Sequence, residues 1–426
     1  MIEIHPDPYN QFTFRDSDPK TTSLEEVVFT GKHVLAKCHC DDSNYSFYHT
    51  FPVGYDLWFP ISFSEDGKMS YFKKSAEHWL ARPLLDSFFL KDQVQVPIEK
   101  IVYRRYKKVI ILNCLDSCFG HILYKLFNAQ THLKEHSQYG LVLLIPKTLL
   151  WLVPEGVAEV WHVDVSRNAQ LDQRIGNLDT FVKTELQRFE KAFLSFAFVH
   201  HDLTLFNFSL FFKTSPFSLD HFTTLTPQIT FVCREDRFWL TNQIDILLYL
   251  ASVKFSVMNV MRSYFVYRQN RSIRKAIKIM NRELKNPQYF VVGIGRTGRF
   301  EKPINDFREA TTVSSQREKE WCSIYARSHM VIGVHGSNMT IPTSLAAGFI
   351  NLLPYHKVSH LGEDITVRHR PQDVPFLARF LNLPASSQLV ARHAVSMIKD
   401  FFHHYYEEKD YNADPLSIVE RYRSFS

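Results

Sequence analysis

Short apolar runs alternate with longer segments of helical period from about residue 107 onward. Residues 108–113, 140–146 and 160–164 are apolar runs of the length expected for buried strands, and residues 120–134 have the period of an amphipathic helix. A strand, a helix and a further parallel strand in this order form a βαβ unit. The pattern therefore predicts an α/β domain in this part of the chain.

The same alternation returns in the second half of the chain. Apolar runs predict strands at 228–233, 289–294, 330–334 and 349–353. Helical periods begin at Ile244 and cover 272–285, 315–326 and 393–406, and residues 193–212 are apolar and β-prone. Residues 1–100 instead alternate short aromatic-rich strands with turns. We expect a β-rich N-terminal accessory segment (1–100) and two α/β domains (101–225 and 226–426).

One predicted strand ends in an unusual corner. Residues 330–334 lead into the sequence His335-Gly336-Ser337-Asn338-Met339, and Pro342 lies where a helix is expected to begin, a position that tolerates proline. Backbone N–H groups at a helix start attract anions, and a glycine lets a ligand approach the main chain. The corner therefore indicates a phosphate site, with an ordinary α/β turn as the alternative.

A pair of arginines follows another predicted strand. Arg234 and Arg237 come directly after residues 228–233, and Asn242 precedes the next helical run. Guanidinium groups bind phosphate oxygens in pairs and remain charged at any working pH. The alternative is a solvated turn in which Glu235 and Asp236 neutralise both arginines.

Together the two motifs resemble the donor-binding domain of glycosyltransferase family 61. The resemblance covers residues 226–356 and rests on Arg234, Arg237, Leu240 and Asn242 and on the 335–339 block with residues 345–354. It departs at Ser337, where alanine is usual, and in a long insertion after Asn242. The resemblance implies a GT-B-like fold, with two Rossmann-like domains facing a cleft. It also implies that a sugar is transferred with inversion from a nucleotide-sugar donor, with UDP as the expected nucleotide. Arg234, Arg237 and residues 335–339 would bind this donor.

An inverting transferase needs a base that deprotonates the acceptor hydroxyl. Asp116 and His121 follow the predicted strand 108–113 and are the expected catalytic pair, unless Asp116 or Ser117 only caps the next helix. A second set of candidates for the catalytic base follows the β-prone residues 193–199: His200, His201 and Asp202. Charged loop residues are weaker candidates for contacts with the nucleobase, ribose or sugar of the donor: Asp306, Arg308, Glu363 and Asp364.

Composition limits the function classes further. The chain has 426 residues, 45% of them hydrophobic, and a formal net charge of +6 that is spread along the chain. This suits an anionic nucleotide or a membrane surface, whereas no sequence motif for nucleic-acid binding is present. We expect no signal peptide and no membrane span, six reduced cysteines, and a cytoplasmic protein that is either free or peripheral to the membrane.

Two other motifs were weighed against this interpretation. Cys38 and Cys40, with His33 and His49 nearby, lack a second ligand pair for zinc. The glycines of residues 293–298 match a dinucleotide fingerprint, but the sequence after them, including Pro303, lacks a helical period, so we expect a loop there. No Asp-x-Asp motif has a supporting strand, so no metal is expected at the donor phosphates.

The sequence thus predicts a metal-independent transferase without a cofactor, whose partners are a nucleotide-sugar donor and a glycan or other hydroxyl acceptor. The alternatives are a fucosyltransferase-like enzyme with a GDP-linked donor and a catalytically inert module of the same fold that binds nucleotide or glycan.

Overall fold

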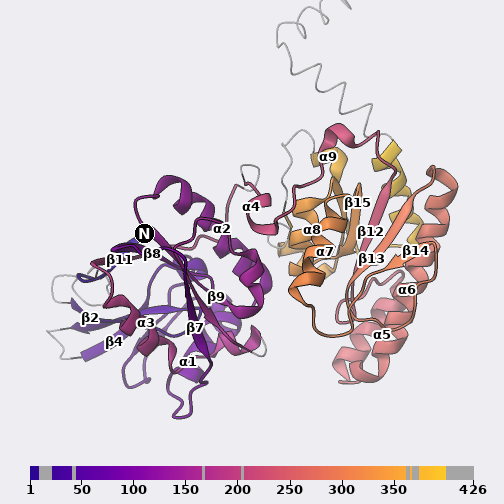
Figure 1. The fold of residues 1–426 in the computed structure, drawn as a ribbon. Helices are drawn as coiled ribbons and strands as arrows, with labels where there is room; N and C mark the ends of the chain where they lie inside the picture. The colour runs from indigo at the N-terminus through magenta and orange to yellow at the C-terminus, as the bar shows by residue number, and fades with distance from the viewer. Residues whose placement is uncertain are drawn as a thin grey trace, which may run out of the picture. The chain divides into compact units, whose positions relative to one another are not determined.

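The computed structural model describes residues 1–8, 22–40, 45–165, 168–202, 206–360, 365–366 and 374–399. The chain divides into two compact units, Met1–Asp202 (unit 1) and Leu203–Ser426 (unit 2) (Figure 1). Both units combine β-sheets with helices, so the fold is mixed α/β. Among the described helices, none is long and apolar enough to cross a bilayer.

The larger sheet of unit 1 has six strands within the described residues, in the order β1-β11-β8-β9-β10-β7. The four central strands are parallel, and β1 and β7 add antiparallel edges. Strands from the first hundred residues thus complete a sheet that the predicted βαβ unit begins. The strands are β1 (Ile2–His5), β7 (Ile98–Val102), β8 (Lys108–Asn113), β9 (Gly140–Pro146), β10 (Glu159–Val163) and β11 (Lys191–Leu194).

Helix α2 (Phe119–Glu135) packs on β8 and β9. Its buried side chains recur at helical spacing, as in Ile122, Leu126 and Ala129, and this periodicity is what made the helix predictable. Two other α-helices of unit 1 are α1 (Arg82–Phe88), which follows a π-helical turn at Glu77–Ala81, and α3 (Leu178–Leu186). Shorter 3-10 turns connect the elements at Gly54–Leu57, Lys74–Ala76, Lys147–Leu152 and Asn168–Asp172.

A separate antiparallel sheet occupies residues 22–71 of unit 1. Its strands follow each other in chain order, and one face packs against α1 through a cluster that includes Val28, Leu35, Phe63 and Leu84. This sheet is the β-rich segment that the aromatic strands and turns predicted. Its strands are β2 (Thr22–Phe29), β3 (Val34–Cys40), β4 (Tyr45–Thr50), β5 (Ser62–Ser64) and β6 (Ser70–Tyr71).

The sheet of unit 2 is parallel throughout, in the order β14-β13-β12-β15-β16-β17. The chain adds strands on one side of β12 and then on the other, which is the order of a doubly wound sheet. The strands are β12 (Gln228–Arg234), β13 (Gln288–Ile294), β14 (Ile304–Asp306), β15 (Met330–Val334), β16 (Gly348–Leu353) and β17 (Ala378–Asn382).

Helices cover this sheet and extend beyond it. The C-terminal half of α6 and a helix at residues 387–399 bury their apolar side chains against β12, β13, β15 and β16. Figure 1 shows α5 and α6 side by side, forming a hairpin at one end of unit 2. The helices are α4 (Ser209–Phe212), α5 (Gln243–Lys254), α6 (Met258–Glu283), α7 (Ser315–Tyr325), α8 (Thr340–Leu345) and α9 (Val374–Leu377), with 3-10 turns at Leu219–His221, Ser337–Met339 and Tyr355–His360.

Three element predictions were wrong in extent. The β-prone stretch 193–212 holds only the end of β11 and then the short helix α4, so residues 200–202 lie beyond a strand that ends at Leu194. The basic helix expected from 272 begins at Met258. The C-terminal helix begins at residue 387 rather than 393, and residues 400–406 of that prediction lie outside the described residues.

Candidate functional site

The order of strands in unit 2 reverses between β12 and β15. These strands are hydrogen-bonded neighbours; β13 and β14 lie on the far side of β12, and β16 and β17 on the far side of β15. In open α/β sheets, ligands bind outside the carboxyl ends of the strands at such a point. The two sequence motifs follow the carboxyl ends of these two strands.

Arg237 brings the two motifs into contact. Its Nη1 donates to the carbonyl oxygen of His335 at 3.1 Å and lies 3.3 Å from Oδ1 of Asn338, although 101 residues separate Arg237 from Asn338. A Cβ atom at Gly336 would lie 1.1 Å from this Nη1, and Gly336 has a φ of +147°. The corner therefore needs glycine for its backbone conformation, and any larger residue would also displace the flexible guanidinium of Arg237.

The other side chains of the corner divide into internal and partly exposed groups. His335 is 1% exposed and lies with its Nδ1 2.8 Å from the amide nitrogen of Asn351, and Met339 is fully buried. Ser337 and Asn338 are partly exposed. A ligand at this corner would thus meet Ser337, Asn338 and Arg237, whereas His335 and Met339 shape the corner from within.

Arg234 has a different environment from Arg237. It forms a bidentate ion pair with Asp236, with both contacts at 2.7 Å, as in the solvated turn that was the alternative for this motif. Glu235 accepts instead from the backbone and hydroxyl of Thr297. Burial acts to raise the pKa of Asp236, but the hydrogen bond from Arg234 and its charge outweigh burial, so the pKa is lowered. Arg234 would have to exchange this carboxylate for a phosphate.

The backbone on both sides of Arg237 is held by α6. The N–H of Trp239 donates to Oε1 of Gln269 at 2.9 Å, and Nε2 of Gln269 donates to the carbonyl of Arg234 at 3.2 Å. Gln269 is 3% exposed. The buried side-chain amide of Gln269 thus hydrogen-bonds the backbone before and after Arg237 and fixes the position from which the Arg237 side chain extends.

Of residues 293–298, Gly293 and Ile294 end β13 and the rest form a loop that, as predicted, opens no helix. Arg308, which is 2% exposed, makes a bidentate pair with Asp306, donates to the carbonyls of Thr297 and Gly298, and lies 4.6 Å from the ring centroid of Phe300. These two candidates therefore hold the loop together. Glu363 and Asp364 lie outside the described residues.

Unit 1 has its own cavity at the carboxyl end of β8, with a volume of about 240 Å³. The chain leaves β8 at Asn113, and α2 starts after its N-cap residue Cys118. Both predicted catalytic residues line the cavity, but so do charged groups from other segments. The lining residues include Lys32, His78, Trp79, Asp116, Ser117, Cys118, His121 and Asp172.

Asp116 is the centre of a buried charge cluster. Its Oδ1 lies 3.0 Å from Nδ1 of His121 and accepts from the N–H of Cys118, and its Oδ2 lies 3.0 Å from Nζ of Lys125. Both Asp116 and Lys125 are at most 5% exposed. Burial acts to raise the pKa of Asp116, but Lys125 and His121 outweigh burial and hold the pKa well below its usual range.

The pKa values of His121 and Cys118, which neighbour Asp116, are shifted as well. Burial acts to lower the pKa of His121, but its hydrogen bonds to Asp116 and Cys118 outweigh this and raise the pKa to about 10. Burial acts to raise the pKa of Cys118, but the interaction with His121 outweighs it and lowers the pKa. At neutral pH His121 is an imidazolium, so it can act as a base only in the small fraction of molecules that has lost this proton.

The rival base candidates lie in different environments. The ring of Tyr55 contacts His121, with centroids 4.5 Å apart, and approaches His200 at 6.1 Å. His200 is exposed, whereas Nε2 of His201 points to the carbonyl oxygen of Tyr124 at 2.9 Å. Burial is the main cause of a lowered pKa at His201. His121 and His200 therefore gather around Tyr55, and His201 contacts α2.

Sequence reasoning missed several groups of the unit 1 cavity. Lys32 reaches Asp172 at 2.5 Å, and Ser117 donates to the same carboxylate at 2.6 Å. No local pattern joins residues 32, 117 and 172. Cys118, in contrast, lies three residues before His121 on α2, a spacing that brings side chains together and that the sequence displayed.

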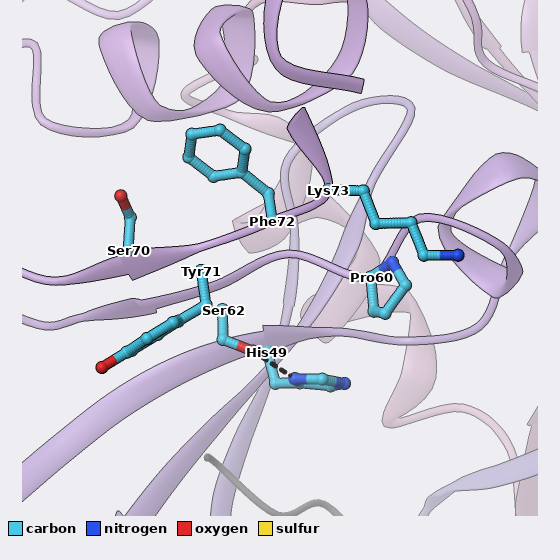
Figure 2. Close-up of a pocket in the computed structure, with 7 residues that line it drawn as sticks. All are labelled: His49, Pro60, Ser62, Ser70, Tyr71, Phe72 and Lys73. Atoms are coloured by element: carbon cyan, nitrogen blue, oxygen red, sulfur yellow. Dashed lines mark hydrogen bonds between the residues drawn. The ribbon is translucent and has the colours of Figure 1, made fainter. Parts of the chain in front are cut away.

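A second cavity, of about 380 Å³, lies on the small sheet of unit 1 (Figure 2). His49 and Ser62 lie side by side on neighbouring strands at its edge, with Nδ1 and Oγ 2.6 Å apart, and Tyr71, Phe72 and Lys73 also line it. His49 is thus bound to a hydroxyl, and His33, also considered as a zinc ligand, lies 2.8 Å from a carboxylate oxygen of Asp56. Among the described residues, no three His, Cys, Asp or Glu side chains form a group that could hold a metal.

Any assignment of function rests on these arrangements of side chains, because comparison with known proteins identifies no relative of this chain. Searches of the chain against protein-family models, curated proteins and solved structures return no significant match.

Proposed function

We propose that the protein is a nucleotide-sugar-dependent glycosyltransferase whose donor diphosphate binds at the Arg237–Gly336 corner of unit 2. One observation carries this proposal: Arg237 and residues 335–338 meet at the point where the strand order reverses. A cationic fork, partly exposed polar groups and a glycine backbone at that position suit a diphosphate. The resemblance to family 61 adds the class of reaction, with inversion and a UDP-linked donor.

In this proposal the two units form a GT-B-like pair, with Rossmann-like sheets that supply donor and acceptor sides. Unit 1 also has a polar cavity at the carboxyl end of β8, in a sheet whose strand order reverses between β8 and β11. Arg237 would stabilise the departing diphosphate without a metal. The acceptor would be a hydroxyl held near Asp116 and His121. A GDP-linked donor remains the alternative within the same fold.

Binding is the first test. Calorimetry with UDP, GDP, CMP and NAD should show binding of a nucleoside diphosphate. Arg237→Ala should weaken it by about 1.5–3 kcal/mol, the range for charge-assisted hydrogen bonds, and Arg237→Lys should restore only part. Arg327→Ala, at an exposed arginine after α7, is the matched control. Unchanged diphosphate affinity in a folded Arg237→Ala protein removes the donor site from this corner.

Turnover separates an enzyme from an inert module that only binds nucleotide. Asp116→Asn and His121→Ala should each lower turnover by about 10²–10⁴, with donor affinity unchanged. If unprotonated His121 is the base, the wild-type rate should rise with pH up to about 10. A rate that is already flat near neutral pH and is lost in His200→Ala assigns the base to His200 instead. Donor binding without transfer or hydrolysis at any pH favours the inert module.

A further inference from the structure

The α5–α6 hairpin, residues 243–283, has an apolar outer surface that the described part of the chain leaves uncovered. Besides Tyr267, six of its aliphatic and aromatic side chains are each more than half exposed, which is unusual for a single short segment. Their exposed fractions are 67% for Ile244, 66% for Leu247, 57% for Leu250, 53% for Val253, 69% for Phe255 and 79% for Val260.

The hairpin does not need this surface in order to fold onto unit 2. Its opposite face contributes Phe265 and Val266 to a buried cluster with Phe238 and Leu240. The two helices are also joined by an ion pair between the buried Asp245 and Arg268, 3.1 Å apart. Because packing is satisfied on the inner face, the outer apolar positions call for a different explanation.

Positive charge predominates on the hairpin, whose two acidic residues, Asp245 and Glu283, lie near its ends. Residues 246–282 contain no Asp or Glu but eight Lys and Arg residues. On α6, exposed residues recur every three or four positions and so share one outward face. The face is aliphatic and aromatic near the start of the helix and basic further along: Val260, Tyr264, Tyr267, Arg271, Lys275, Lys278 and Arg282.

A basic cavity of about 470 Å³ borders the same helix. Arg274 and Lys278 of α6 line it together with Arg299 and Lys302, against a single acidic residue, Glu301. The positive charge of α6 therefore continues into a hollow that can accept an anionic group.

We propose that this hairpin docks on the surface of an anionic lipid bilayer. The exposed aliphatic side chains and Phe255 enter the boundary of the acyl chains, the tyrosines lie at the interface, and the basic side chains of α6 meet the lipid headgroups. A second copy of the chain fits less well, since two such faces would place like charges opposite each other. The observations behind this surface do not depend on the reaction proposed for the diphosphate corner.

Vesicle binding by the full chain tests this surface. The protein should sediment with phosphatidylcholine vesicles that contain phosphatidylserine, much less with phosphatidylcholine alone, and less again as salt screens the charges. The triple variant Arg271→Gln, Lys275→Gln, Lys278→Gln should lower partitioning on the order of 100-fold, at about five-fold per basic residue. Leu247→Glu with Phe255→Glu should lower it at least about ten-fold.

Matched variants elsewhere control for lost charge and lost apolar area. Lys91→Gln with Lys134→Gln and Lys319→Gln removes the same charge, and Leu225→Glu changes an exposed leucine outside the hairpin; both should bind vesicles as the wild type does. Thermal melting checks that every variant is folded. The proposal is overturned if the wild-type protein does not sediment with vesicles, or if it binds neutral and anionic vesicles equally. It is also overturned by a wild-type dimer that Leu247→Glu with Phe255→Glu turns into a monomer, because the occupant is then a second copy.

Discussion

At position 336 only a hydrogen atom fits between the backbone and the guanidinium of Arg237. A methyl group there has two costs that can be measured separately: it meets a movable side chain, and it occupies a backbone region with φ of +147° and ψ of 175° that is almost restricted to glycine. The side-chain cost depends on Arg237, and the backbone cost does not.

Gly336→Ala should therefore lower the free energy of unfolding by about 1–3 kcal/mol, mainly through the backbone, and should weaken diphosphate binding by moving Arg237. Urea denaturation and calorimetry on Gly336→Ala, Arg237→Ala and the double variant measure both effects. In the double variant, the loss of affinity should be smaller than the sum of the two single losses. Strictly additive losses would show that Gly336 does not act through Arg237.

The Cys118 thiol gives a second test at the scale of single residues. The interaction with His121 lowers its pKa below the ordinary value of 9.0, whereas burial raises the pKa of Cys38, Cys114 and Cys233 to about 12. Because the thiolate is the reactive form, the iodoacetamide rate at Cys118 should remain high as pH falls below 9.0, where the other three thiols are protonated.

Peptide mapping by mass spectrometry follows each cysteine separately. His121→Gln should move the half-maximal pH at Cys118 upward, because burial then acts without the imidazolium, and Cys118→Ser should remove the fast site. Preferential alkylation of Cys38 or Cys114 in the folded protein would contradict the assignment.

At the scale of elements, the apolar pattern predicted seven parallel strands and the helices α2 and α7 with errors of at most one residue at each end; the strands are β8, β9, β10, β12, β13, β15 and β16. The parallel strands β14 and β17 were not predicted. The predicted elements bury one face or lie wholly in the core, so their burial appears in the sequence as a periodic pattern or a continuous run of apolar residues. The first half of α6 failed this rule, because its outward face bears Val260 and Tyr267 where a solvated helix would have polar residues. β11 was predicted too long: of the apolar residues after Leu194, Ala197 and Val199 are buried without strand pairing, and Phe198 is 43% exposed.

The candidate sites were predictable to a similar degree. Strand ends located both Arg237 with residues 335–338 and Asp116 with His121, since parallel strands deliver their following loops to one edge of a sheet. The partners of these residues were predictable only where they are local. The pairing of Arg234 with Asp236 was one of the two alternatives that the sequence offered, whereas the arrival of Lys32 and Asp172 beside Asp116 depends on loop conformations and on a contact between residues 140 positions apart.

At the scale of the whole molecule, the two sites belong to different compact units. Arg237 and its contacts all lie within Leu203–Ser426, and the Asp116 cluster lies within Met1–Asp202. A fragment of residues 203–426 should therefore bind nucleoside diphosphate with the affinity of the full chain, whereas residues 1–202 should not. Calorimetry on both fragments, each shown to be folded by circular dichroism, measures this. A folded 203–426 fragment that has lost binding would show that unit 1 supplies part of the donor site.

Gln269 gives α6 a second role. The same helix that carries the exposed basic face also holds the backbone on both sides of Arg237 through one buried amide. Any displacement of α6 would move this amide and, through it, the backbone that carries Arg237. Thermodynamic linkage then relates the two binding events: if attachment to a membrane surface changes the phosphate affinity by some factor, bound phosphate must change the affinity for the surface by the same factor.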